Sequence, residues 1–182
     1  MNYCLIGIVG FILFFLYDFN EIYKVHQGLK YAFTVGFVLQ LIATVGVLYT
    51  YKDFWVFSLP GLITSALGIF LLIYALFFAL PFEATYIHGD EKRKAYDQGV
   101  YALSRHPGVL FYMIFYLGLA MFEWSGAILL IFSIWSSFNI LYILYQDVYI
   151  FPKLFSNYDQ YKKQTPFLFP TIKSIKLFIN TF

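Results

Sequence analysis

Five long runs without a charged residue constrain this chain more than any other feature. They cover residues 2–17, 31–51, 54–82, 107–122 and 124–146. A helix needs about 17–25 mostly apolar residues to cross the hydrocarbon core of a bilayer, and each run approaches or exceeds that length. The pattern therefore predicts an all-α, polytopic membrane protein with about five transmembrane helices.

The composition supports a membrane protein and excludes several soluble classes. Only 12% of the residues are charged, whereas a soluble domain carries about 25%. The single cysteine, Cys4, rules out an internal disulfide framework and a cysteine-based zinc site. A net charge of +2 gives no reason to expect a nucleic-acid partner. We expect one membrane domain over residues 1–182, with the bilayer as its partner and no metal site.

The Lys and Arg residues predict the orientation of the chain. Eleven of the twelve lie in residues 18–30, in residues 83–108 or after residue 146, and only Lys52 lies elsewhere. Cytoplasmic loops of membrane proteins carry an excess of Lys and Arg. Five spans with the amino terminus outside would place all eleven in the cytoplasm, together with the carboxyl terminus and the polar segments.

Local signals refine the expected helices. Pro60, near the start of the third run, predicts either a kink or a helix that begins there. Residues 123–126 separate the fourth and fifth runs, which predicts a tight helical hairpin whose two legs return to the same side.

An Arg-His-Pro tripeptide, Arg105-His106-Pro107, opens the fourth run. Proline suits the first turn of a helix, so Arg105 and His106 are expected at a helix amino terminus. Free N–H groups and the helix dipole favour an anion there, and a guanidinium matches a carboxylate. These residues predict a pocket for a small molecule with a carboxylate. A simple capping role near lipid headgroups remains the alternative.

Asp147 follows the fifth run directly. The dipole disfavours an acid at the carboxyl end of a helix, so a cationic partner is expected. If the fourth and fifth runs form a hairpin, Asp147 lies beside Arg105 and His106. Alternatively, Asp147 marks the membrane edge, or it holds ribose hydroxyls or a positively charged cofactor.

Aromatic and basic residues alternate in the carboxyl-terminal segment. Such a segment can lie along the interface, with its rings at headgroup depth and its ammonium groups in water. A cytosolic, interfacial membrane anchor and a lid over a site explain the pattern equally well. The residues concerned are Phe155, Tyr158, Tyr161, Phe167, Phe169, Lys173, Lys176 and Phe178.

Taken in order, the polar motifs resemble the carboxyl half of isoprenylcysteine carboxyl methyltransferases, whose superfamily includes phospholipid methyltransferases. The resemblance covers residues 83–170, about half of the chain. It is carried by Gly99, Tyr101, Arg105, His106, Pro107, Asp147, Phe155, Tyr158, Tyr161, Lys162, Lys163, Pro166 and Pro170.

The resemblance implies S-adenosyl-L-methionine as cofactor on the cytosolic side. Its pocket would be lined by Tyr101, Arg105, His106, Pro107 and Asp147, the last standing where the family usually has a glutamate. The chain is then expected to comprise three amino-terminal spans (1–82), a cofactor-binding half (83–170) and a tail (171–182).

The resemblance also implies a methyltransferase that acts on a lipid, prenylated or otherwise lipophilic acceptor. Isoprenylcysteine enzymes have a substrate-binding Arg one helical turn before the acid, whereas this chain has Ile143. The family's Tyr two positions beyond the Pro is Val109 here. A phospholipid N-methyltransferase, a small-thiol methyltransferase and a non-catalytic scaffold of the same fold therefore stay open as alternatives.

Overall fold

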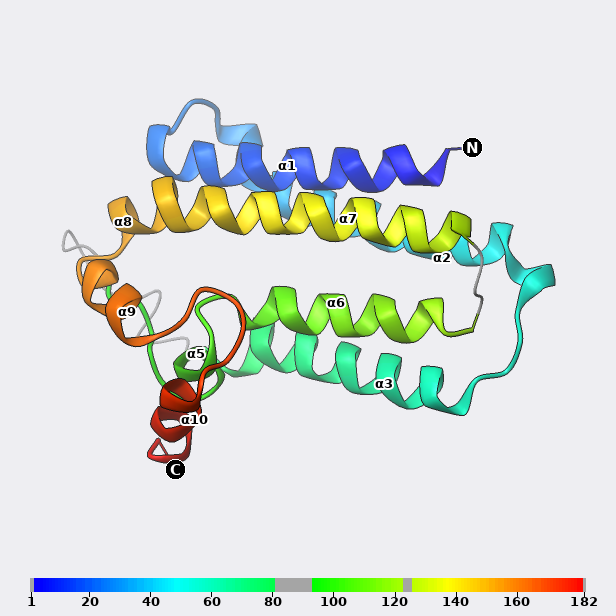
Figure 1. Ribbon diagram of the computed structural model, residues 1–182. Helices are drawn as coiled ribbons and strands as arrows, with labels where there is room; N and C mark the ends of the chain where they lie inside the picture. The colour runs from blue at the N-terminus through cyan, green and yellow to red at the C-terminus, as the bar shows by residue number, and fades with distance from the viewer. Residues whose placement is uncertain (1, 81–92, 123–125, 182) are drawn as a thin grey trace.

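The computed structural model describes residues 2–80, 93–122 and 126–181. Within these ranges it consists of helices and their connections, with no β-strand (Figure 1). The bundle is formed by α1 (Tyr3–Tyr23), α2 (Ala32–Thr50), α3 (Leu59–Ile73), α6 (Pro107–Ala120) and α7 (Gly126–Tyr145). The short elements are η1 (Gln27–Tyr31), η2 (Lys52–Phe54), η3 (Tyr74–Phe78), α5 (Val100–Leu103), η4 (Gln146–Ile150), α8 (Phe151–Leu154), α9 (Tyr158–Gln164) and α10 (Ile172–Ile179).

Among the residues that the structure describes, four helical segments are long and apolar enough to cross a membrane: Tyr3–Tyr23, Gln27–Thr50, Leu59–Phe78 and Gly126–Leu154. Helix α6 is apolar too, but it has only 14 residues. At about 1.5 Å per residue, it covers about 21 Å of a hydrocarbon core that is about 30 Å thick. The predicted all-α, polytopic membrane fold is confirmed, with the fourth helix shorter than a full span.

Helix starts follow the local sequence signals. The Ser58 hydroxyl accepts a hydrogen bond from the Gly61 N–H at 3.1 Å, and Pro60 lies in the first turn of α3. Proline therefore begins this helix and does not kink it, because its missing N–H is one that the first turn leaves unpaired. Pro107 begins α6 in the same way, with His106 as the capping residue.

Small residues bring the helices together in pairs. A Cβ on Gly10 of α1 would lie only 2.9 Å from the carbonyl oxygen of Gly36 in α2. A Cβ on Gly118 of α6 would collide with the backbone of Ser65 in α3. Such close backbone approach is characteristic of helix packing in membranes. The pairs α1–α2 and α3–α6 are therefore the closest contacts of the bundle.

Helix α7 joins these pairs, since it packs against both α1 and α6. Its Trp135 is fully buried, and the indole Nε1 donates to the carbonyl oxygen of Cys4 at 3.1 Å. Tyr116 of α6 and Phe132 of α7 pack beside this indole, and the centroids of the Tyr116 and Phe132 rings lie 4.6 Å apart. An aromatic core thus fixes α7 between the two pairs.

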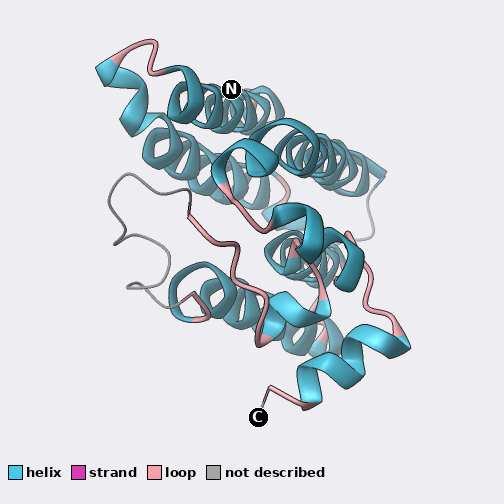
Figure 2. Ribbon diagram, turned by 90° about the vertical axis from the view of Figure 1, so that its left-hand side faces the viewer, coloured by secondary structure: helices cyan, strands magenta, loops and turns pink. Residues whose placement is uncertain are grey.

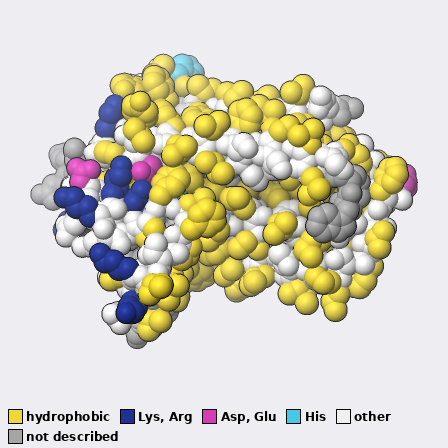
Figure 3. All heavy atoms as spheres, in the orientation of Figure 1, with side chains coloured by type: hydrophobic (Ala, Val, Ile, Leu, Met, Phe, Trp, Pro, Cys, Tyr) yellow, Lys and Arg dark blue, Asp and Glu magenta, His cyan; other side chains and the backbone are white. Residues whose placement is uncertain are grey.

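The polar elements gather at one end of this bundle. Helices α5, α8, α9 and α10 lie at the end opposite the amino terminus, in front of the bundle helices when viewed along the bundle (Figures 1 and 2). Lys and Arg side chains crowd the same end, while the sides of the bundle are mostly hydrophobic (Figure 3). The fold thereby brings the polar motifs of residues 99–107 and 147–166 to one end.

Candidate active site

The residues just before α6 are not helical, with Ser104 extended, and they present two polar side chains. The backbone N–H of His106 donates to the Ser104 hydroxyl at 3.1 Å. Ser104 and His106 are both buried, with 1% and 6% of their surface exposed. Pro107 then begins the helix. The Arg105 and His106 side chains consequently lie at the amino terminus of α6, as the tripeptide predicts.

Asp147 lies opposite, in the π-helical turn η4 that continues α7 beyond the expected end of the fifth run. Arg105 binds its carboxylate through two hydrogen bonds, from Nε to Oδ1 at 2.8 Å and from Nη2 to Oδ2 at 3.2 Å. Both side chains are less than 10% exposed. A bidentate guanidinium–carboxylate pair combines charge with fixed geometry. The cationic partner expected for Asp147 is therefore Arg105.

Three further side chains converge on the same carboxylate. The Tyr158 hydroxyl donates to Oδ1 at 2.6 Å, the His106 Nε2 lies 3.4 Å from Oδ1, and the Lys162 Nζ lies 3.2 Å from Oδ2. Asp147 is thus surrounded by groups from α9 and from the two residues that precede α6. We call Arg105, His106, Asp147, Tyr158 and Lys162 the Asp147 cluster.

Burial shapes the protonation of this cluster. Burial lowers the pKa of His106 below its ordinary value of 6.5, against the opposing hydrogen bond to Asp147. At neutral pH the imidazole is therefore neutral, and Nε2 can donate to the carboxylate as an N–H. Burial, and next the hydrogen bond to Asp147, raise the pKa of Tyr158, so its phenol remains a proton donor.

Arg105 also fastens the segment that follows α9. Its Nη1 donates to the carbonyl oxygens of Lys162 at 3.2 Å and Thr165 at 2.8 Å. Its backbone N–H donates to the carbonyl oxygen of Pro166 at 3.0 Å. One arginine therefore joins the start of α6, the end of α7 and the carboxyl-terminal segment. These contacts favour a cover over the site as one role of that segment.

Aromatic rings enclose His106. The Phe151 ring is nearly parallel to the imidazole, at 13° and 5.7 Å between centroids, and the Phe167 ring meets it edge-on at 5.1 Å. Arg105 also lies 5.7 Å from the centroid of the Phe167 ring. The cluster is therefore polar at its centre and aromatic at its edge, which suits a ligand with both charged and planar parts.

Three of the five predicted site residues lie together, and the other two make contacts that support the fold around them. Arg105, His106 and Asp147 lie together, whereas Pro107 is a buried helix start. The Tyr101 hydroxyl donates to the carbonyl oxygen of Ala75 at 3.0 Å, and the Tyr101 carbonyl accepts from Tyr161. Tyr101 therefore connects α5 with η3, which follows α3, and with α9.

Tyr158 and Lys162 belong to the site, although sequence reasoning did not assign them to it. Both lie in the second polar motif, four residues apart and therefore on one face of α9. That spacing could have identified them once Asp147 was expected to meet the same segment.

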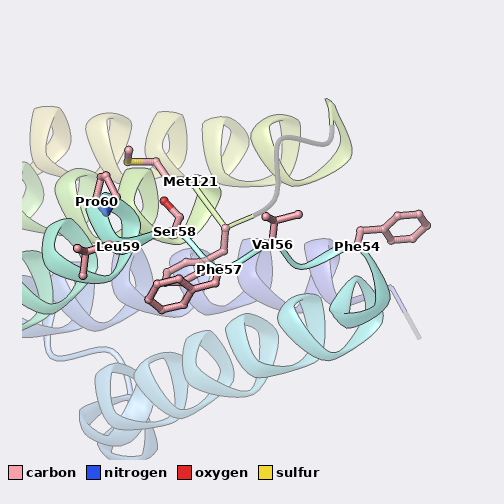
Figure 4. Close-up of a pocket in the computed structure, with 8 residues that line it drawn as sticks. Phe54, Val56, Phe57, Ser58, Leu59, Pro60 and Met121 are labelled. Carbon is pink, nitrogen blue, oxygen red and sulfur yellow. The ribbon is translucent and has the colours of Figure 1, made fainter.

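A groove of about 470 Å³ lies at the opposite end of the bundle (Figure 4). It is lined by Phe54, residues 56–60, Met121 and Phe122. The lining has no charged side chain, and the Ser58 hydroxyl is already used to cap α3. The groove therefore lacks the polar groups that would orient a charged small molecule.

Comparison with known proteins places the chain in a family. Searches of curated proteins and of solved structures return no match. The family model described as phospholipid methyltransferase matches residues 56–156, more than half of the chain. The match includes Arg105, His106 and Asp147 and reaches from the start of α3 to just beyond α8. The protein therefore belongs to the phospholipid methyltransferase family, within the superfamily that its motifs resemble.

Proposed function

We propose that the Asp147 cluster binds S-adenosyl-L-methionine and that the protein transfers the cofactor's methyl group to a lipophilic acceptor. One observation carries this proposal. Arg105, His106 and Asp147 converge from two helices at one end of a membrane bundle that belongs to a methyltransferase family. Membrane methyltransferases of this family are generally dependent on that cofactor.

The residues of the cluster fit the cofactor in chemical kind. S-adenosylmethionine has a carboxylate, an ammonium group, ribose hydroxyls and an adenine ring. Lys162 and the amino terminus of α6 suit the carboxylate. Asp147 suits the ammonium group or the ribose hydroxyls, and Phe151 and Phe167 suit the adenine ring. The proposed site includes Tyr101 and Pro107 as lining residues.

Asp147 already has four partners, so cofactor binding must replace at least one of them. Lys162 is the partner best able to move, because its side chain is 34% exposed, compared with 9% for Arg105 and 4% for His106. We propose that Lys162 turns from Asp147 to the cofactor carboxylate. The Oδ2 atom of Asp147 then accepts a hydrogen bond from the cofactor.

The bound cofactor supplies a methyl group activated by a positively charged sulfur. The protein contributes binding and alignment, which can lower the barrier by several kcal/mol. Arg105 fixes the direction of the Asp147 carboxylate, and the segment held by Arg105 covers the cluster. Neutral His106 donates to Asp147 and remains enclosed by rings that exclude water.

The acceptor is proposed to approach from the bilayer. Every bundle helix has apolar side chains exposed on its outer side, which is the surface that lipid chains cover. An acceptor with a hydrocarbon tail can stay in lipid while its polar end reaches the ends of α6 and α7. No passage through water is then needed.

The Lys and Arg distribution supports a cytoplasmic site. Among the described residues, Lys52 lies near the amino-terminal end of the bundle, and the other Lys and Arg residues lie in segments at the opposite end. By the positive-inside rule we propose an outside amino terminus and a cytoplasmic carboxyl terminus. Within the one domain, we propose 1–82 as the amino-terminal spans, 83–170 as the cofactor-binding half and 171–182 as the tail.

Calorimetric titration of S-adenosylmethionine into the full-length protein in detergent tests cofactor binding. His106→Ala and Asp147→Ala should each weaken binding by about tenfold or more, the loss expected for a hydrogen bond to a charged group. Asp159→Ala is the matched control, because it removes an exposed acid at the same end of the molecule. Unchanged affinity in both site variants would overturn the assignment.

Incubation with total lipid extract and methyl-labelled cofactor tests turnover. Wild-type protein should label a lipid-soluble product, and Asp147→Ala should not. Cofactor binding without any labelled product would favour the non-catalytic scaffold. A labelled water-soluble thiol would favour the small-thiol enzyme.

A further inference from the structure

The carboxyl-terminal helix α10 leaves one apolar side largely exposed. Ile172, Ile175 and Ile179 are spaced three and four residues apart, so they share one side of the helix. Their exposed fractions are 78%, 43% and 62%, and we call them the Ile face. The helix itself is well formed, because Thr171 and Ser174 make a complete capping box at its start. An ordered helix with such a face is expected to bind an apolar partner.

The side of α10 that faces the protein fixes its depth along the bundle. Phe178 packs against a small buried cluster formed by Ala75, Val100 and Phe111. Ala75 lies within Leu59–Phe78, a segment that is long and apolar enough to cross a membrane. Phe111 lies in the second turn of α6. Helix α10 is therefore level with the last turns of the bundle helices and does not lie above them in water.

Helix α10 runs across the bundle and not along it. In the view along the bundle (Figure 2), the long helices are seen nearly end-on. The helix next to the carboxyl terminus is seen from the side, at the edge of the molecule. Since the long helices cross the bilayer, α10 lies parallel to the membrane surface. Amphipathic helices with this direction and depth lie where acyl chains meet the headgroups.

The side of α10 next to the Ile face is positively charged. Lys173 and Lys176 are three residues apart and exposed, and neither forms an ion pair with any residue that the structure describes. Residues 160–182 contain four Lys and no Asp or Glu. Near the carboxyl terminus, Figure 3 shows Lys or Arg side chains directly beside hydrophobic ones. A lysine in this position keeps its methylene groups in lipid and its ammonium group among the phosphates.

From the depth, the direction and the two sides of α10 we infer that this helix binds the membrane surface. The Ile face enters the acyl region of the leaflet at this end of the bundle, and Lys173 and Lys176 bind the phosphates of anionic lipids. By the proposed orientation this is the cytoplasmic leaflet, whose surface is negatively charged. The inference does not depend on cofactor binding or on methyl transfer.

Membrane binding of α10 also holds the second end of the segment that covers the Asp147 cluster. Arg105 holds the first end through the carbonyl oxygens of Thr165 and Pro166. Thr171, which caps α10, follows only five residues after Pro166, and α10 packs on α5. The cover and the membrane anchor are therefore consecutive parts of one carboxyl-terminal segment.

Spin labels on full-length protein in phosphatidylglycerol nanodiscs test the depth of α10. Ile175→Cys places a label on the Ile face, and Asp159→Cys places one on the exposed side of α9 as the control. Both are made with Cys4→Ser, because Cys4 is the only native thiol. Oxygen concentrates in acyl chains, whereas a nickel chelate stays in water. The ratio of oxygen to chelate accessibility should be several-fold higher at 175 than at 159, and equal ratios would overturn the inference.

Hydrogen exchange on unlabelled protein tests the preference for anionic lipid. The α10 amides should exchange about fivefold or more slowly in phosphatidylglycerol nanodiscs than in phosphatidylcholine nanodiscs, since each Lys near an anionic surface contributes about fivefold in affinity. The double variant Lys173→Gln, Lys176→Gln should lose this difference. Lys52→Gln is the control, because it removes a Lys at the opposite end of the bundle, and it should keep the difference.

Two results would overturn the binding of anionic lipid. One is equal exchange of wild-type α10 in the two lipids. The other is slower exchange when inorganic phosphate is added to phosphatidylcholine nanodiscs, because the two lysines would then bind a free anion and not a membrane surface.

Discussion

Arg105 and Asp147 lie 42 residues apart in the sequence and meet through two hydrogen bonds of 2.8 and 3.2 Å. The same guanidinium holds two carbonyl oxygens of the carboxyl-terminal segment. This pair therefore does more than neutralise charge, because it holds the start of α6, the end of α7 and the end of α9 together at the site.

Arg105→Lys should loosen the carboxyl-terminal segment even though the charge is kept. A lysine cannot bind a carboxylate through two parallel bonds and also reach both carbonyl oxygens. We expect the free energy of unfolding to fall by about 2 kcal/mol or more, since hydrogen bonds to charged groups contribute about 1.5–3 kcal/mol each. Trypsin should cleave faster after Lys162 and Lys163. Lys163→Arg, at an exposed position, is the control and should show wild-type cleavage.

Two tyrosines of α9 offer a matched comparison. Tyr158 donates to the charged carboxylate of Asp147, whereas Tyr161 donates to the neutral carbonyl oxygen of Tyr101 at 2.7 Å. Tyr158→Phe should cost about 2 kcal/mol of unfolding free energy and Tyr161→Phe about 1 kcal/mol. Only Tyr158→Phe should also weaken cofactor binding. Equal effects on binding would show that Asp147 does not need the phenol.

The stability of the protein should fall as the pH drops below about 6.5 because of His106. Burial lowers the pKa of His106 in the folded state, so the unfolded chain binds a proton first. The contribution of neutral His106 to the free energy of unfolding is complete above the pKa of histidine in the unfolded chain, about 6.5. It is lost as the pH falls through the lower pKa of His106 in the folded protein. Melting curves from pH 8 to pH 5 should show this loss. His106→Gln should reduce the slope, and an unchanged slope would contradict the assignment.

Gly118→Ala should separate α3 from α6. The added Cβ would collide with the backbone of Ser65, and overpacking of this kind costs about 1–3 kcal/mol. Gly126→Ala is the control, because a Cβ there meets nothing within 4 Å. Thermal unfolding in detergent should show a lower melting temperature for Gly118→Ala and no decrease for Gly126→Ala.

The sequence predicted the helices well, because hydropathy along the chain determines which segments can lie in a bilayer. It also predicted that Asp147 meets Arg105 and His106. A hairpin of the fourth and fifth runs brings the end of the fifth run back to the start of the fourth. The hairpin turn at residues 123–125 itself lies outside the described residues. The same is true of residues 81–92 in the long polar segment.

Other features could not be predicted from the sequence. The hydrogen bond between Asp18 and Gln146 joins residues 128 positions apart, and no periodic pattern indicates it. The fifth helix continues as far as Leu154, because a π-turn carries the backbone past Asp147. The alternation of aromatic and basic residues in the carboxyl-terminal segment is compatible with an anchor and with a lid, and the contacts of Arg105 with Thr165 and Pro166 favour a lid.

The shortness of α6 has a consequence for the surrounding lipid. Its 14 residues fall about 9 Å short of the hydrocarbon thickness of a typical bilayer. Where lipids border α6, as at the exposed Leu117, local thinning of the bilayer is one way to match its length. Such a dimple draws phosphate and glycerol groups down towards His106, so an acceptor headgroup has less distance to travel out of its own leaflet.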